Sequence, residues 1–157
     1  MINDIRSTIM PEDMYVRQNL RSRDIKEGDI ITAVVSEYNF DERRVYCEVS
    51  SHLRKAFIRL ENFGFPEISS DFDRHHIPPI IEKHIGKQIV AIVVSKGTKG
   101  DFELDRKTLL SDTTSYLANN IGTVVTATVT AFGRYEAFID IGNGVISRLT
   151  INEASIN

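Results

Sequence analysis

The chain has few of the features that mark secreted or membrane proteins. It holds a single cysteine, Cys47, so an intramolecular disulfide is excluded, which favours a reducing compartment. No apolar run approaches the roughly 20 residues that a helix needs to span a bilayer. The first residues, MINDIRST, lack the basic start and apolar core of a secretory signal. We therefore expect a cytoplasmic protein that makes no membrane contact.

A strong excess of charge of one sign is also missing. The 157 residues carry a formal net charge of -3, and 41% are hydrophobic and 26% charged, as in ordinary globular proteins. This length is enough for one or two small domains. Because the chain is not a polycation, any binding of nucleic acid must use a local basic patch.

The clearest pattern is GTVVTATVTAFGRYEAFIDIGNG, residues 122–144, which predicts two β-strands joined by a turn. Residues 125–130 alternate between apolar side chains and threonine, with the period of two that is typical of a half-buried strand. Phe138 falls out of phase with the apolar residues of the second strand, so its ring is predicted on the solvent face. Gly-Asn-Gly at 142–144 predicts a tight turn with positive φ angles.

An earlier stretch repeats this pattern. GDIITAVVSEY aligns with GTVVTATVTAF, which places Gly28 against Gly122, Ser36 against Thr130 and Tyr38 against Phe132. Tyr46 takes the place of Phe138 if the turn of the first copy is two residues longer. This self-similarity predicts one β-unit that is used twice.

The combination of a glycine, an alternating Val/Thr strand, an aromatic-x-Ala-Phe run, Asp-Ile-Gly and a further glycine resembles the S-one domain, an RNA-binding OB-fold repeat. The resemblance implies a mostly β fold, with a five-stranded OB-fold barrel followed by a partial second OB-fold unit. We expect an N-terminal extension at 1–24, the barrel at 25–110, a connector at 111–120 and the incomplete unit at 121–157. Short helices are expected in the extension and the connections.

The resemblance also implies a site for single-stranded RNA. Family members place two aromatic residues around strand two and a histidine on strand three, and these match Tyr135, Phe138 and Thr150 in the second unit. In the first unit the matching positions are Arg43, Tyr46 and Ile58, so one aromatic residue remains there. The Asp and Arg that the family often carries in the last hairpin match Gly97 and Asp101. RNA binding is therefore expected most clearly of the second unit, where Arg134 and Arg148 supply positive charge.

Basic residues gather in the first unit as well. Between residues 43 and 59 the net charge is +4, because Glu48 is the one acid beside Arg43, Arg44, Arg54, Lys55 and Arg59. With Tyr46 on the same strand parity and Phe57 nearby, these residues form the expected face for stacking of bases and neutralisation of phosphates. The alternative is that the charges keep exposed strands soluble and prevent edge pairing.

The remaining elements follow from shorter signals. Apolar alternation predicts strands at 30–38, 45–49, 55–60 and from 102, while the continuous apolar run at 89–94 is typical of a strand buried on both faces. One helical turn is predicted at 80–84, and another in the connector, capped by Ser111 or Asp112. Pro11 predicts the start of a short helix. This segment either docks on the barrel, with Arg17, Arg21 and Arg23 around its apolar side, or forms a basic arm that contacts RNA phosphates.

The sequence favours a binding protein over an enzyme. It has no nucleophile–base arrangement and no glycine loop for phosphate, so neither catalytic residues nor a cofactor are expected. DFDRHH, at 71–76, contains carboxylates and imidazoles, yet it matches no metal signature and we expect no metal. The alternative to RNA binding is an OB-fold assembly domain that no longer binds nucleic acid.

The incomplete second unit raises the question of partners. Three strands of an OB-fold leave unpaired edges, which invite association. Three outcomes remain open: the chain is a fragment of a longer protein, a homodimer or another partner supplies the missing strands, or the unit leans on the first barrel and stays open.

Overall fold

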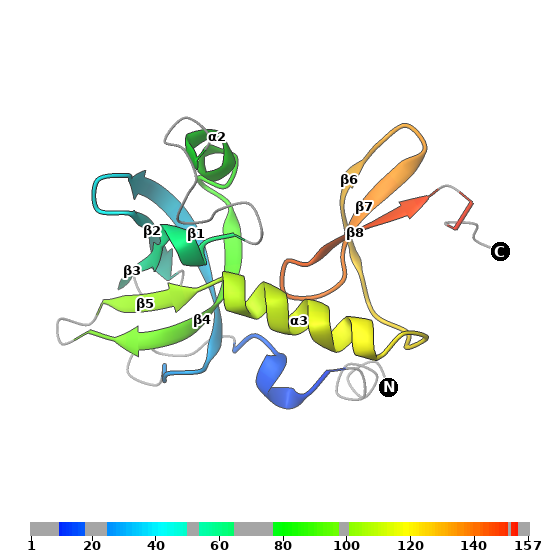
Figure 1. Cartoon of the computed structure of the whole chain (residues 1–157), viewed down its shortest axis with the longest axis horizontal. Helices are drawn as coiled ribbons and strands as arrows, with labels where there is room; N and C mark the ends of the chain where they lie inside the picture. The colour runs from blue at the N-terminus through cyan, green and yellow to red at the C-terminus, as the bar shows by residue number, and fades with distance from the viewer. Residues whose placement is uncertain are drawn as a thin grey trace.

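Five strands close into a barrel in the first part of the chain (Figure 1). The computed structural model describes residues 10–17, 25–49, 54–64, 77–97, 101–150 and 152–153. The barrel strands are β1 (Ile30–Asn39), β2 (Arg44–Val49), β3 (Arg54–Arg59), β4 (Gln88–Lys96) and β5 (Phe102–Asp105). Their order is β1-β2-β3-β5-β4, with β3 and β5 parallel and the other neighbours antiparallel. This mixed five-stranded barrel is consistent with the OB-fold that the sequence predicts.

Alternating apolar residues fill the barrel. Along β2, Val45, Cys47 and Val49 are buried, while Tyr46 and Glu48 between them face outwards. In β4 the expectation of burial on both faces is wrong, because alternate residues point outwards and Val94 is 43% exposed. Because the barrel has one apolar interior, β4 is fully buried only on its inward face. The other described residues cover only part of its outward face.

The burial of Cys47 leads to a first prediction. Its side chain is 1% exposed, and the loss of water around the sulfur raises the pKa of the thiol to about 12. Since the thiolate is the reactive form, the native protein should resist a thiol reagent at pH 8, and unfolding should release full reactivity. Titration with and without denaturant measures this. Rapid modification of the native chain would show that the barrel opens at β2.

The helices connect and close the barrel. Pro11 precedes η1 (Glu12–Met14), so the predicted helix start is present as one 3-10 turn. After η3 (Leu60–Asn62), α2 (Ile77–Glu82) buries Ile81 completely in the barrel core. It begins three residues earlier than the predicted turn at 80–84.

The connector is a full helix, which corrects the expectation of a single turn. α3 (Lys107–Asn119) begins before Ser111 and Asp112, the two residues predicted to cap it. The side chain of Asp105 acts in their place, because its oxygens accept hydrogen bonds from the Thr108 backbone at 2.8 Å and hydroxyl at 2.7 Å. The last residue of β5 thus holds the first turn of α3. The described part of the chain contains no helix with the length and apolar character needed to cross a membrane.

A separate antiparallel sheet follows α3. It consists of β6 (Thr128–Phe132), β7 (Glu136–Asp140) and β8 (Ile146–Thr150), in sequence order. Its register repeats that of the barrel: a β-bulge falls after Val35 in β1 and after Val129 in β6. At both bulges a hydroxyl donates to a carbonyl across the strand pair, Ser36 to Tyr46 at 3.0 Å and Thr130 to Phe138 at 3.2 Å. These matches agree with the alignment of the two units made from the sequence.

The second sheet stays open where the barrel is closed. Residues 30–34 of β1 pair with β4, but no described segment forms such a strand beside their equivalents at 124–128, and β6 begins only at Thr128. Tyr38 packs against the barrel core, whereas the equivalent Phe132 is 82% exposed. None of the described residues after Thr113 is fully buried.

The turn between β7 and β8 joins the open sheet to α3 (Figure 1). Gly142, Asn143 and Gly144 all have positive φ, as predicted. The Asn143 side-chain amide donates to the Met14 carbonyl at 3.0 Å and to the Thr113 hydroxyl at 3.1 Å. A Cβ on Gly142 would lie 3.4 Å from the Met10 side chain, so the turn fits closely here. This turn therefore contacts η1 and α3.

Candidate nucleic-acid interface

The strongest part of the candidate interface is one face of the second sheet. Phe138 of β7 and Arg148 of β8 are directly paired, so their side chains lie on the same face. Phe138 is half-buried, and Arg148 is exposed. The Arg148 Nε lies 3.3 Å from a carboxylate oxygen of Glu136, so the guanidinium is held by an ion pair within the sheet. An aromatic ring and a cation thus share one face of the second sheet.

Tyr135 occupies the end of the hairpin and not this face. It lies in the β6–β7 turn, is 63% exposed, and has the Arg134 guanidinium 5.2 Å from its ring centroid. With Phe132 and Leu149 it lines a shallow, largely apolar pocket of about 270 Å³. Phe132 and Leu149 belong to the face opposite Phe138, because both are in register with Ala137. A single-stranded nucleic acid could contact the rings of both Phe138 and Tyr135 only by passing over the end of the hairpin.

Thr150 has a local partner. Its backbone N–H and its hydroxyl donate to one carboxylate oxygen of Glu153, at 2.9 and 2.7 Å, and these bonds lower the pKa of that carboxyl. The register also corrects one match between the units. Thr150 pairs with Glu136 as Arg59 pairs with Arg44, so the equivalent of Thr150 is Arg59 and not the fully buried Ile58.

Four of the predicted residues of the first barrel share one outward face: Arg44, Tyr46, Lys55 and Arg59. Arg44, Tyr46 and Glu48 of β2 pair with Arg59, Phe57 and Lys55 of β3. The guanidinium of Arg44 lies over the Phe57 ring, 4.1 Å from its centroid. Arg54 begins β3, and its side chain is outside the described residues. The strand parity inferred from the sequence is therefore correct for Arg44, Tyr46, Lys55 and Arg59, but Arg54 is in register with Val49 and falls on the other parity. Phe57 supplies a second ring.

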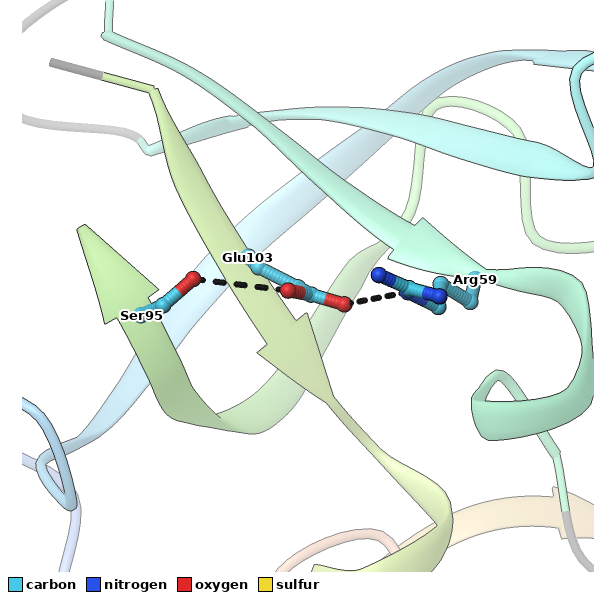
Figure 2. Close-up of polar contacts among 3 residues, drawn as sticks. All are labelled: Arg59, Ser95 and Glu103. Atoms are coloured by element: carbon cyan, nitrogen blue, oxygen red, sulfur yellow. Dashed lines mark hydrogen bonds and ion pairs between the residues drawn. The ribbon is translucent and has the colours of Figure 1, made fainter. Parts of the chain in front are cut away.

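Arg59 is held by an acid from a neighbouring strand. Its Nε donates to Glu103 of β5 at 2.6 Å, and the other carboxylate oxygen of Glu103 accepts from the Ser95 hydroxyl of β4 at 3.3 Å (Figure 2). The bond to Glu103 raises the pKa of Arg59 further, so this cation is permanent but already paired. Sequence reasoning missed Glu103, since the parallel pairing of β3 with β5 brings together residues 44 positions apart.

Acids also surround Tyr46. Its hydroxyl donates to Glu42, which is the main reason that the pKa of Tyr46 is raised. A hollow of about 550 Å³ beside the ring is lined by Glu37, Glu42 and Glu48, with Lys55 as the one cation among its described residues. Such a surface repels phosphate. Arg43, which has a positive φ of 54°, lies with Arg44 and Arg59 around a separate hollow of about 220 Å³.

The first barrel thus has a mainly acidic part near Tyr46 and a part of mixed charge near Arg44 and Arg59, where Glu42 and Glu61 line the same hollow. The second sheet keeps ring and cation together at Phe138 and Arg148. The segment at 71–76, considered for metal, and the predicted arm residues Arg21 and Arg23 lie outside the described residues. Within the described ranges no three His, Cys, Asp or Glu side chains group as metal ligands.

Comparison with known proteins adds no assignment to this geometry. No protein-family model matches the chain, and no curated protein is significantly similar to it.

Proposed function

We propose that this chain is a non-catalytic, S-one-type OB-fold module that binds single-stranded RNA through the second sheet. The observation that carries the proposal is the paired Phe138 and Arg148, an aromatic ring and a guanidinium on one outward sheet face. Bases of a single strand stack on such rings, and cations beside them neutralise phosphates. Tyr135 and Arg134 extend this surface around the hairpin end. The basic residues around Arg44 provide a secondary contact for the RNA. The module would act in the cytoplasm, in translation or RNA metabolism.

A titration with labelled single-stranded RNA at two salt concentrations tests the proposal. Affinity should fall steeply as salt rises, with a slope of about −0.7 in log–log form for each phosphate neutralised. A parallel titration with single-stranded DNA shows whether the sugar matters. Absence of binding at low salt would contradict the proposal.

The role of Arg148 gives a sharper prediction. Arg148→Gln should weaken RNA binding and reduce the magnitude of the salt slope by about 0.7, because one phosphate contact is lost. Lys26→Gln is the matched control, since it removes an exposed cation that precedes β1 and lies outside the second sheet. Equal slopes for Arg148→Gln and the unchanged chain would remove Arg148 from the interface.

Protein assembly is the second candidate, favoured by the exposed apolar residues of the open sheet. Val124 is 78% exposed and Phe132 82% exposed, and among the described residues no strand pairs with 124–128 as β4 pairs with their equivalents in the barrel. Under this alternative the occupant is a second copy of the chain, because an antiparallel edge can pair with itself about a twofold axis. A dimer in light scattering together with no RNA affinity at low salt would support assembly. A strict monomer would exclude it.

A further inference from the structure

We propose that a pocket between the first barrel and the second unit binds a nucleotide, either free or as one unit of an RNA chain. The pocket has a volume of about 370 Å³, within the range of small-molecule sites. Its walls come from four places far apart in the sequence: the residues after η3, the residues after α2, the start of α3, and the β7–β8 turn with the first residue of β8. It is separate from Phe138 and Arg148, which do not line it.

One wall of the pocket is basic. Lys83, His84 and Arg106 line it, and no acidic residue is among the described residues that do so. Lys83 is exposed, so its ammonium group can reach a ligand at the mouth. The pocket therefore favours an anion, in contrast with the acidic hollow beside Tyr46.

Buried Phe63 fixes two of these basic groups. The Arg106 Nη1 donates to the Phe63 carbonyl at 2.9 Å, and its guanidinium lies 5.2 Å from the centroid of the Phe63 ring. The His84 ring meets the Phe63 ring edge to face, with centroids 5.3 Å apart and an interplanar angle of 88°. The basic wall is thus held in place by the core and needs little ordering when a ligand binds.

A second wall of the pocket is apolar. Leu110, one turn after Arg106 on α3, lines it together with Val145 and Ile146 of the second unit, and Ile146 is 53% exposed. An inorganic phosphate would leave this wall in contact with water. A nucleotide satisfies both walls, with the phosphate at Lys83 and Arg106 and the flat base against Leu110, Val145 and Ile146.

The joint between the units shapes this site. Asn143 ties the β7–β8 turn to Met14 and Thr113, and a Cβ on Gly144 would lie 3.6 Å from Leu110. Binding in the pocket would therefore contact both units at once and hold their relative position. The pocket does not require RNA to bind at the second sheet, so the two proposals can be tested apart.

The test is calorimetric titration of the full chain with AMP, adenosine and inorganic phosphate. We expect AMP to bind about tenfold tighter than either adenosine or phosphate, because only AMP contacts both walls. Lys83→Gln should weaken AMP binding about tenfold through loss of a charge-assisted contact, and Lys26→Gln should leave it unchanged. Lys83 is chosen over Arg106 because Arg106 also holds the Phe63 carbonyl.

Three results would overturn the proposal: no AMP binding, equal affinity for AMP and phosphate, or equal behaviour of Lys83→Gln and Lys26→Gln. Competition then separates the two sources of the nucleotide. If AMP displaces labelled single-stranded RNA and Lys83→Gln weakens RNA binding, the pocket takes a nucleotide of the RNA. If AMP binds without displacing RNA, the pocket takes a free nucleotide. AMP binding in a chain without RNA affinity would refute the proposed function alone.

Discussion

Replacing Phe138 by alanine should weaken binding of single-stranded RNA by about 5- to 150-fold, the equivalent of the roughly 1–3 kcal/mol that one stacked base contributes. Phe138 is half-buried on the outward face of β7 and stands beside Arg148. Removing the ring leaves the cation in place, so affinity should fall while the salt slope stays nearly constant. Fluorescence polarisation with an RNA of about 4–16 nucleotides, the footprint of one OB-fold, measures both quantities.

The control for this variant is Tyr116→Ala on α3. Tyr116 is a partly buried aromatic residue outside both sheets, so its loss should leave RNA affinity unchanged. Circular dichroism of both variants confirms that the sheets remain folded. Equal affinities for Phe138→Ala and Tyr116→Ala would place the RNA elsewhere.

Tyr135→Ala then tells whether the strand passes around the hairpin. Tyr135 lines the pocket with Phe132 and Leu149, on the side opposite Phe138. We expect a loss of about 1–3 kcal/mol if a base stacks there under Arg134, in addition to the loss at Phe138. An unchanged affinity would confine the RNA to the Phe138 face.

Much of the fold could be predicted from local patterns in the sequence. The period of two located the strands, and the aligned Gly28 and Gly122 both have positive φ, at 88° and 93°. The repeated bulge and its hydroxyl bond at Ser36 and Thr130 follow from the same alignment. These features depend on residues close together in the chain, which is why they could be read from it.

The features that sequence reasoning missed depend on distant partners. Residues 124–127 have the composition of a strand, but a strand requires a neighbour, and none of the described segments supplies one. Asp105 is the last residue of β5, and its hydrogen bonds to Thr108 form only because α3 begins directly after the strand. The hydrogen bond from Tyr46 to Glu42 depends on the geometry of the β1–β2 turn, and the bond from Arg59 to Glu103 depends on the register of β3 with β5. Neither could be predicted from the sequence.

A pair of phenylalanine variants tests whether the second unit is open in solution. Phe102 of β5 is completely buried in the barrel, and Phe102→Ala should lower the free energy of unfolding by about 3–5 kcal/mol, through lost burial and the cavity left behind. Phe132 of the open sheet serves as the comparison. Because its side chain is 82% exposed, Phe132→Ala should change the free energy of unfolding by no more than about 0.5 kcal/mol. Urea unfolding followed by circular dichroism measures both.

The outcome at Phe132 distinguishes the two candidate functions. If the open sheet is the form that binds RNA, the face that carries Phe132 stays in contact with water. Phe132→Ala then changes the free energy of unfolding little at any protein concentration. If a second copy closes the sheet, Phe132 becomes buried, and the alanine variant should lose about 2 kcal/mol or more in a manner that depends on protein concentration. A small loss at Phe102 would contradict the packed barrel itself, because a fully buried ring cannot be removed from a close-packed interior at little cost.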